Sequence, residues 1–500
     1  MIVLTTLNAR FTHTAIGLRY LYANMNELQD ETKILEFSIN DVIQSVAEKI
    51  LAHAPSIVGV GVYIWNATQT HELIEVIKKV SPQTIVILGG PEVSYTPFRV
   101  NYDRADFIIQ GEGDSAFYKL CQEINSGTAP KEQLIKPILA DLGNIALPYE
   151  HYSDEDIANR YIYVEASRGC PFMCEFCLSS IDEKVRNFDI DRLITAFETL
   201  WQRGVRNYKF IDRTFNLNIR FANKILDFFL EKEEDFFAHF EVIPDHFPES
   251  IKEKIRLFPA GSLQLEVGIQ TLNPEISENI SRPLKLKKIR ENLRFLEEQT
   301  KVHMHVDLIV GLPGEDLVSF GRNLNELKEM VSCEIQIGIL KKLSGTIIDR
   351  HDVQHEMVYS DIPPYDVLST KDVSFQEIQK MKRFARFWDI AYNSGNFSKT
   401  IPLLFAQDVF QNFYDFTLWI YDATQSTWKI SLERFSELLF SYLCEEKKLE
   451  KSEVAEFLIE DIMAIKGRNV PKFLKALGYD KVKVDDQVVV GKLKRQAKRS

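Results

Sequence analysis

The stretch Ser167-Arg168-Gly169-Cys170-Pro171-Phe172-Met173-Cys174-Glu175-Phe176-Cys177 contains three cysteines in the spacing Cys-x3-Cys-x2-Cys. Thiolates select iron–sulfur clusters or zinc, and this spacing can place three of them around one cubane cluster. A structural zinc site or a closed electron-transfer cluster would need a fourth protein ligand, and the neighbouring cysteines are the distant Cys121 and Cys333. A disulfide would leave one thiol unpaired. The motif therefore predicts a cluster with one iron open to a ligand.

Strand–helix units continue from this motif toward the carboxyl end. Short apolar runs alternate there with amphipathic patterns such as Ile190–Arg203 and Leu284–Glu298. The predicted strands are Tyr161–Ala166, Tyr208–Asp212, Ala238–Ile243, Leu263–Ile269, Val302–Val310 and Glu334–Leu340. Six such units predict a partial, open (β/α)6 barrel over residues 161–345. Barrels of this kind carry functional groups on the loops after their strands, which is where the three cysteines fall.

The first 125 residues show the same alternation, with helical patterns such as Val42–Ala52 and His71–Val80. The predicted strands are Ile2–Leu7, Thr32–Ile39, Ser56–Trp65, Thr84–Leu88 and Ala105–Ile109. This pattern predicts a Rossmann-like parallel sheet covered by helices on both faces. Polar or glycine-rich loops follow the first, third, fourth and fifth strands, and ligands bind at this edge of a parallel sheet.

The predicted fold class is therefore α/β in its first two domains, followed by a mainly α-helical region at residues 346–500. A polar stretch at residues 126–160 contains proline, lacks sustained periodicity and is expected to link the two α/β domains. Aromatic-rich helical patterns such as Gln376–Tyr392 and Phe435–Leu443 characterise the last region. We expect this region to cap the barrel mouth and shape the substrate pocket. Tyr359 and Tyr365, around a pair of prolines, could donate a proton or hydrogen, and packing is the favoured role.

Composition excludes several classes of protein. A net charge of −12 gives no general attraction for nucleic acid, although Lys492–Arg499 is basic. The first residues lack the features of a secretion signal, and no apolar run approaches the length of a membrane span. We expect a cytoplasmic protein with no nucleic-acid partner and no membrane span. The isolated Cys121, Cys333 and Cys444 are expected to be buried, inert thiols.

The cysteine motif resembles the cluster loop of radical S-adenosylmethionine (SAM) enzymes. The resemblance implies that Cys170, Cys174 and Cys177 hold a [4Fe–4S] cluster and that the methionyl group of SAM chelates the open iron. An electron from the cluster would then cleave SAM into methionine and a 5′-deoxyadenosyl radical. A reductant such as flavodoxin or ferredoxin is implied as a partner.

Further residues resemble the SAM-binding positions of this superfamily at the fourth and fifth strand ends. Those expected to bind SAM are Phe176, Asp212, Glu266, Gln270, Arg282, Val310, Gly311 and Leu312. Arg282 either neutralises the SAM carboxylate or is a surface arginine ending a helix. The family's Gly-Gly-Glu after the second strand is absent here. Asp212 or a backbone carbonyl would then meet the SAM amine, and an ordinary ion pair with Arg213 is the competing role for Asp212.

An α/β domain ahead of such a barrel resembles the cobalamin-binding class of radical SAM proteins, over about Met1 to Ser344. The resemblance implies that loops of a Rossmann-like cobalamin-binding domain surround the corrin ring and its nucleotide tail. The residues concerned are Asn8, Arg10, His13, Tyr63, Trp65, Asn66, Gly89, Gly90, Pro91, Glu92, Gly111, Glu112 and Gly113. The alternative is a scaffold without a corrinoid, since a fold does not fix a function.

His13 could coordinate cobalt through a neutral imidazole. The Asp-x-His-x-x-Gly motif of histidine-ligated corrinoid proteins is, however, missing, because the loop reads Thr12-His13-Thr14-Ala15-Ile16-Gly17. A polar role in the loop or at a helix start is the favoured alternative for His13.

The leading hypothesis for function is a cobalamin-dependent radical SAM methyltransferase that acts on an unactivated carbon of a small molecule. One alternative keeps both cofactors but performs a rearrangement, cyclisation or oxidation without methyl transfer. A second alternative is a non-catalytic corrinoid or redox sensor. The identity of the substrate, the catalytic acid or base and the oligomeric state are not readable from these residues.

Overall fold

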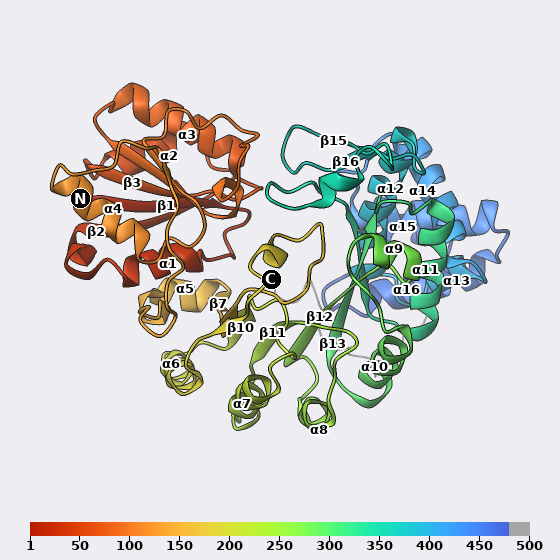
Figure 1. Ribbon diagram of the computed structural model, residues 1–500. Helices are drawn as coiled ribbons and strands as arrows, with labels where there is room; N and C mark the ends of the chain where they lie inside the picture. Colours follow the sequence, from red (N-terminus) through yellow and green to blue (C-terminus); the bar gives the residue numbers. More distant parts are fainter. Residues whose placement is uncertain (480–500) are drawn as a thin grey trace.

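A computed structural model describes residues 1–479, and it consists of three successive units (Figure 1). An N-terminal α/β unit, red to orange, is followed by a strand–helix barrel in yellow and green. A helical unit in blue lies against one side of this barrel. The predicted α/β class with a helical C-terminal region is confirmed. The basic segment Lys492–Arg499 lies outside the described residues.

The N-terminal unit is a parallel sheet with the order β2-β1-β3-β4-β5-β6. Its strands are β1 (Ile2–Asn8), β2 (Thr32–Ser38), β3 (Ile57–Gly61), β4 (Ile85–Gly89), β5 (Phe107–Ile109) and β6 (Leu134–Ile135). Successive residues of β1 enter different cores: Ile2 and Leu4 pack with helices α1 (Ile16–Ala23) and α4 (Ala116–Asn125). Val3 and Leu7 pack with α2 (Ile43–Leu51) and α3 (Ala67–Val80). Both faces of the sheet are thus buried, as a parallel sheet requires.

One sequence-based expectation for this unit, the end of its third strand, is wrong. The third strand does not reach Trp65, because the chain turns after Gly61. The Asn66 side chain closes this turn by accepting from the Tyr63 N–H at 2.8 Å and donating to the Gly61 carbonyl at 3.1 Å. The stretch at residues 126–160, expected to link the two α/β domains, also adds strand β6 to the sheet and contains helix α5 (Asp154–Asn159).

The second unit is an open, curved parallel sheet with the order β14-β13-β12-β11-β10-β7. Its strands are β7 (Ile162–Val164), β10 (Asn207–Phe210), β11 (Phe237–Val242), β12 (Leu263–Gln270), β13 (His303–Val310) and β14 (Glu334–Ile339). Helices cover its outer surface (Figure 1); they are α6 (Ile190–Gln202), α7 (Ile219–Leu230), α8 (Glu249–Leu257), α10 (Leu286–Gln299) and α11 (Leu317–Met330). The six strands confirm the predicted partial barrel.

Alternation along β12 shows how the barrel separates its core from its interior. Leu263, Leu265 and Val267 are buried in the hydrophobic core, while the intervening positions are partly accessible and polar or small. Because successive strand residues point to opposite faces, this pattern directs Glu266 and Gln270 into the barrel.

The third unit begins with a hairpin of β15 (Val358–Tyr359) and β16 (Val367–Ser369). Its helices are α12 (Phe375–Trp388), α13 (Pro402–Phe405), α14 (Val409–Thr424), α15 (Leu432–Ser441), α16 (Lys451–Met463) and α17 (Lys472–Ala476). The Trp388 indole N–H donates to the Ile335 carbonyl of β14 at 3.0 Å, and one hydrophobic core extends through the barrel and these helices. The helical unit therefore completes the barrel core at its β14 edge. Among the described residues, no helix is both long and apolar enough to cross a membrane.

Candidate cofactor sites

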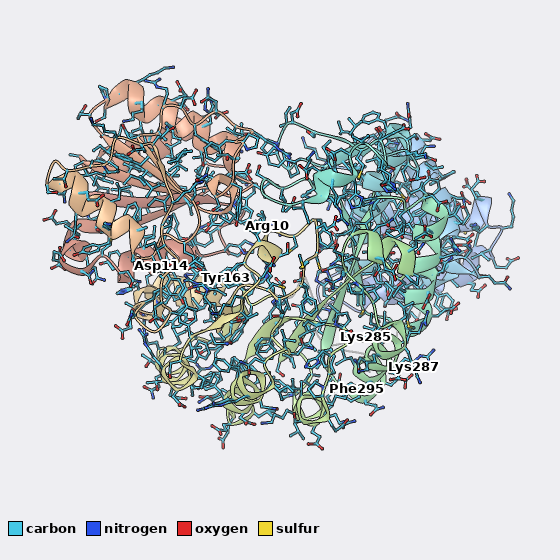
Figure 2. All side chains as sticks on the ribbon, viewed as in Figure 1. Arg10, Asp114, Tyr163, Lys285, Lys287 and Phe295 are labelled. Atoms are coloured by element: carbon cyan, nitrogen blue, oxygen red, sulfur yellow. The ribbon has the colours of Figure 1, made fainter. Side chains whose placement is uncertain are left out.

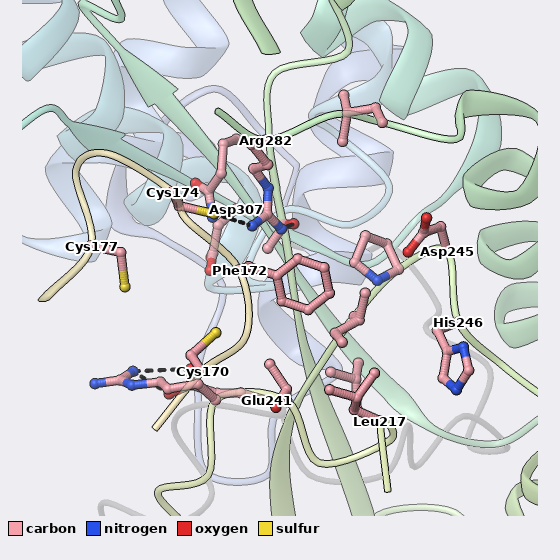
Figure 3. Close-up of a pocket in the computed structure, with 18 of the residues that line it drawn as sticks. Cys170, Phe172, Cys174, Cys177, Leu217, Glu241, Asp245, His246, Arg282 and Asp307 are labelled. Carbon is pink, nitrogen blue, oxygen red and sulfur yellow. Dashed lines mark hydrogen bonds and ion pairs between the residues drawn. The ribbon is translucent and has the colours of Figure 1, made fainter. Parts of the chain in front are cut away.

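A cavity of about 490 Å³ opens at the carboxyl ends of the barrel strands, and all three motif cysteines line it (Figure 3). Cys170 and Cys174 are buried, and Cys177 is half-buried. Phe172 and Phe176 of the same loop also line this cavity. Three thiols on one loop are the donor set that an iron–sulfur cluster requires, so the residues present fit a cluster.

The backbone of the cluster loop is held tightly at its start. Gly169 has a φ of +88°, and a Cβ there would lie 2.5 Å from the Lys184 carbonyl oxygen. Only glycine avoids both the left-handed strain and this clash. The Cys170 N–H then donates to the Asp182 carbonyl at 2.9 Å. These contacts place Cys170 at the cavity wall.

Arg282 lies directly beside Cys174 of the cluster loop (Figure 3). Its guanidinium donates to Cys174 Sγ at 3.1 Å and to the Gly268 carbonyl. This arginine is thus a partly buried cation beside a cysteine thiol, in a cavity that also holds carboxylates. From this position the guanidinium can also donate to the carboxylate of a bound ligand, because it has several N–H donors.

The cavity floor carries charged residues from neighbouring strands. Glu266 accepts from His239 Nε2 at 3.1 Å, and Arg213 bonds Glu241 at 2.7 Å. Burial opposes ionisation of Glu266, but the hydrogen bond and charge of His239 lower its pKa overall. The floor therefore presents a carboxylate that is ionised at neutral pH, which suits a cationic or hydroxyl-bearing ligand.

The structure brings only part of the predicted SAM set together. Phe176, Glu266, Gln270 and Arg282 line the cavity with the cysteines. The remaining members Asp212, Val310, Gly311 and Leu312 are buried and do not line it. Gly311 has a φ of +85°, and its Cα faces Val367 of β16.

Asp212 has a local structural role in this arrangement. Its carboxylate accepts from the Ala166 N–H at 2.9 Å and from the Ser167 hydroxyl at 2.6 Å, immediately before the cluster loop. Burial raises the pKa of Asp212 to about 7 despite these bonds. The competing role for Asp212, an ion pair with Arg213, is wrong, because Arg213 pairs with Glu241.

Several cavity residues were not predicted from the sequence. They are Phe172, Arg213, Thr214, Leu217, Glu241, Val242, Ile243, Pro244, Asp245, His246, Gly268 and Asp307, with others on the α10 side. Strand periodicity could have identified Glu241 and Gly268, because each lies two residues from another position that faces into the barrel. Figure 3 shows Phe172 projecting toward the middle of the cavity, with Asp245 and His246 on the far side.

Glu315 lies beyond β13 and allows a test of this barrel's electrostatics. Its carboxylate accepts from Thr271 at 2.8 Å and Asn323 at 2.8 Å, and burial raises its pKa to about 7. The folded chain therefore holds a proton that the unfolded chain has lost, and the free energy of unfolding should fall as pH rises from about 4.5 to 7. Glu315→Gln should remove a component on the order of 1–3 kcal/mol of this fall.

Melting temperatures of the cofactor-free protein between pH 4.5 and 8 check this prediction. Glu329→Gln, at an exposed position of the same helix α11, is the matched control and should keep the wild-type slope. A Glu315→Gln protein whose melting temperature follows the wild-type slope would contradict it.

A second cavity, of about 290 Å³, lies at the carboxyl edge of the N-terminal sheet. Glycines line much of it: Gly17, Gly59, Gly61, Gly89, Gly90, Gly111 and Gly113. A Cβ added at Gly89 would meet no protein atom within 4 Å, so a side chain there would enter the open volume. Tyr63 and Phe117 contribute ring surfaces. Glycine walls leave room for a flat, extended group to enter this cavity, which we call the slot.

The predicted cobalamin residues divide between this cavity and the contacts around it. Tyr63, Gly89, Gly90, Pro91, Gly111, Glu112 and Gly113 line the cavity, whereas Asn8, Arg10, His13, Trp65, Asn66 and Glu92 do not. Exposed Trp65 stacks on Tyr63 with ring centroids 4.5 Å apart, beside the slot. Asn8 donates to the His13 carbonyl at 3.0 Å, and Arg10 is exposed.

His13 is held by the barrel. Its Nδ1 lies 2.5 Å from the Tyr163 hydroxyl of β7 (Figure 2 shows Tyr163 where the two units meet). Burial, with the nearby cations Lys209, Arg10 and Arg160, lowers the pKa of His13 to about 4. Its imidazole is therefore neutral at neutral pH and hydrogen-bonded to tyrosine.

Glu92 and Glu112 carry contacts between units. Buried Glu92 accepts a hydrogen bond from the Tyr365 hydroxyl of the third unit, and the Arg99 guanidinium lies 4.4 Å from that tyrosine ring. Glu112 pairs with Arg186 of the barrel. Tyr365 therefore packs at an interface, as favoured from the sequence.

A buried ion network fixes the slot relative to the cluster loop. Arg168, two residues before Cys170, donates to Asp114 at 2.7 Å and to Glu165 at 2.8 Å (Figure 2 labels Asp114 at this junction). Arg168 and Asp114 both line the second cavity. Arg168 thus lines the second cavity, and Cys170, two residues later, lines the first.

Comparison with known proteins assigns these features to families. Residues 2–120 match the B12 binding domain, residues 164–327 match the Radical SAM superfamily, and residues 353–498 match a protein family of unknown function (DUF4080). The uncharacterized methyltransferase PH0819 of Pyrococcus horikoshii is 23% identical over 409 residues, which cover 75% of this chain and 87% of that protein.

Two further similarities agree with these matches. The cobalamin-dependent radical SAM methyltransferase TokK of Streptomyces tokunonensis is 23% identical over 339 residues, covering 60% of this chain and 49% of TokK. The structure of the cobalamin-dependent SAM radical enzyme OxsB, with aqua-cobalamin and SAM bound, superposes with a TM-score of 0.61 at 12% identity. The match covers 97% of this chain and 82% of OxsB, and at this identity it concerns the fold.

The chain is therefore a radical SAM enzyme. It combines a B12 binding domain with a Radical SAM domain, and a [4Fe–4S] cluster, SAM and cobalamin are the cofactors of these two kinds of domain.

Proposed function

We propose that this enzyme is a methyltransferase that uses a 5′-deoxyadenosyl radical to methylate an unactivated carbon of a small molecule. The observation that carries the proposal is the pair of cavities, one lined by three thiols and one largely by glycines, with Cys170 in the wall of the first and Arg168, two residues earlier, in the wall of the second. The methyltransferase names of PH0819 and TokK support the reaction class. Bound together, the cluster, SAM and cobalamin supply radical generation and methyl transfer.

In this proposal Cys170, Cys174 and Cys177 bind the cluster, and SAM occupies the larger cavity. Arg282 offers its guanidinium to the SAM carboxylate, and Glu266 accepts from a hydroxyl or ammonium group of SAM. Phe176 provides apolar surface beside them. These roles follow from the charge of each side chain and from its place in the cavity wall.

The nucleotide tail of cobalamin would enter the smaller cavity between Tyr63, Gly89 and Gly113. We propose that His13 is not the lower ligand of cobalt, because its Nδ1 bonds Tyr163 and it does not line the slot. Arg10 and Trp65, which were also predicted to bind cobalamin, are exposed on these loops. We propose residues 1–125 as the cobalamin domain, 126–160 as the linker that adds β6 to its sheet, 161–345 as the SAM domain and 346–500 as a helical domain that caps the substrate.

Methyl transfer and the alternative reactions leave different products from SAM. Transfer of the methyl group leaves S-adenosylhomocysteine, whereas radical cleavage leaves methionine and 5′-deoxyadenosine. The reduced, fully loaded enzyme given SAM without substrate should form S-adenosylhomocysteine in an amount close to its bound corrinoid. Mass spectrometry of the quenched mixture measures both products.

The outcomes separate the proposed reaction from its rivals. 5′-Deoxyadenosine without S-adenosylhomocysteine would contradict methyl transfer and favour a rearrangement, cyclisation or oxidation. Neither product would favour a non-catalytic corrinoid or redox sensor. We further propose a cytoplasmic enzyme that receives electrons from a flavodoxin or ferredoxin, because cluster reduction needs a donor of this kind.

A further inference from the structure

Glu175 is an unusual residue within the cysteine motif, because a carboxylate between two cluster ligands is completely buried. Its side chain is 0% exposed. A buried carboxylate is costly unless hydrogen-bond donors surround it. Donors come from Ser281 Oγ, from His351 Nε2 at 2.8 Å and from the Arg350 guanidinium. The charge is therefore accommodated by a dedicated set of partners.

These partners form a socket, which we define as Ile280, Ser281, Arg350 and His351. The Glu175 N–H donates to the Ile280 carbonyl at 3.2 Å, so backbone and side chain are both held. Ser281 has a φ of +53°, in the left-handed region. In this strained conformation the Ser281 hydroxyl donates to the Glu175 carboxylate.

The same turn also reaches the neighbouring cluster ligand. Arg282 follows Ser281 directly and donates to Cys174 Sγ at 3.1 Å. The Arg350 guanidinium additionally bonds the Asn279 carbonyl at 3.3 Å, which ties the two sides of the socket to each other. One short turn thus positions the Cys174 thiol and the next residue of the cluster loop together.

We propose that Glu175 is a positioning residue for the cluster, and that the socket holds the loop between Cys174 and Cys177 in the geometry that binds iron. Its negative charge also contributes to the environment that sets the cluster's reduction potential. The inference deepens the proposed function, since it rests on the cluster. It does not depend on methyl transfer or on cobalamin.

The socket gives the C-terminal part of the chain a role at the cluster. Arg350 and His351 belong to the short helix η5 (Ile348–His351), which directly precedes the residue 353–498 family match. The cavity with the cysteines is lined by described residues no later than Asp307. Arg350 and His351 therefore stand in the segment that leads into the C-terminal unit, and this segment, not that unit's helices, supplies the donors to Glu175. The capping role expected for the C-terminal unit stays a prediction.

The test uses Glu175→Gln in the full-length chain, reconstituted anaerobically with iron and sulfide and measured without SAM or corrinoid. Iron retained after desalting through a chelator should fall roughly tenfold, the scale of losses when support of a metal ligand is removed. The midpoint potential of the remaining cluster, followed by electron paramagnetic resonance, should become less negative because an anion is lost. Glu183→Gln, exposed in the same loop, is the matched control.

Arg350→Gln and Ser281→Ala test the socket independently. Each variant removes one hydrogen-bond donor and leaves the Glu175 carboxylate in place. Both should lose iron faster than wild type. Wild-type iron retention and midpoint potential in Glu175→Gln would overturn the proposal. If Glu175→Gln fails to fold, unchanged retention in both donor variants would overturn it. Iron retention and midpoint potential do not depend on methyl transfer. A failure of the proposed methyl transfer would therefore leave both readouts unchanged, and it can be told apart from a failure of this proposal.

Discussion

Cys174→Ala is expected to abolish 5′-deoxyadenosine formation. Cys174 is one of three thiols in the cavity wall. The remaining cysteines of the described residues, Cys121, Cys333 and Cys444, are distant from this loop in sequence. Two thiols cannot hold a site-differentiated cluster stably. Because loss of merely supporting residues costs 10–100-fold in metal affinity, loss of a ligand should cost more than about 100-fold. The Arg282 guanidinium would also lose the sulfur that it bonds.

Liquid chromatography of reduced reactions with SAM measures this effect, and iron content per chain accompanies it. Cys444→Ala, at a half-buried thiol of the helical unit, should behave as wild type. Corrinoid retention should also be unchanged in Cys174→Ala, because the glycine-walled slot is formed by other residues. Cys174→Ala protein that still cleaves SAM at the wild-type rate would contradict the assignment of the cluster.

Gly89→Leu is expected to remove cobalamin while leaving the radical chemistry of SAM intact. Gly89 ends β4 and lines the slot, and an added Cβ has no protein atom within 4 Å. The leucine side chain would therefore fill ligand volume without displacing the fold. Corrinoid binding should weaken by roughly 5- to 150-fold, since overpacking costs typically about 1–3 kcal/mol.

Absorbance of the desalted protein after incubation with hydroxocobalamin checks this expectation. Gly143→Leu is the control, because this glycine is exposed on the connection between the first two units. SAM cleavage by Gly89→Leu should match the control. Full corrinoid retention in the variant would show that the slot is not the cobalamin site.

The elements of both sheets were predictable because their side-chain periods are strong. In β12 a buried apolar residue recurs at every second position, and this alternation alone identifies the strand and its inward face. The cluster cysteines were predictable for a different reason: three thiols in one short loop have few other physical uses. Local patterns of this kind depend on no distant part of the chain.

The positions that could not be predicted depend on contacts between distant segments. Asp212 stands at a strand end, but its carboxylate turns to the backbone at Ala166. Glu92 follows a strand in a glycine-rich loop, yet it bonds Tyr365, which lies 273 residues later. The socket of Glu175 likewise needs His351. Sequence position indicates the edge of the sheet, whereas side-chain direction is decided by tertiary partners.

The most direct test of the account measures both cofactors in one sample. The wild-type protein is reconstituted anaerobically with iron, sulfide and hydroxocobalamin, desalted, reduced and given SAM. We expect about four iron atoms per chain, near-stoichiometric bound corrinoid and 5′-deoxyadenosine formation in the same preparation. Formation of 5′-deoxyadenosine by a protein that retains no corrinoid would contradict the two-cofactor enzyme.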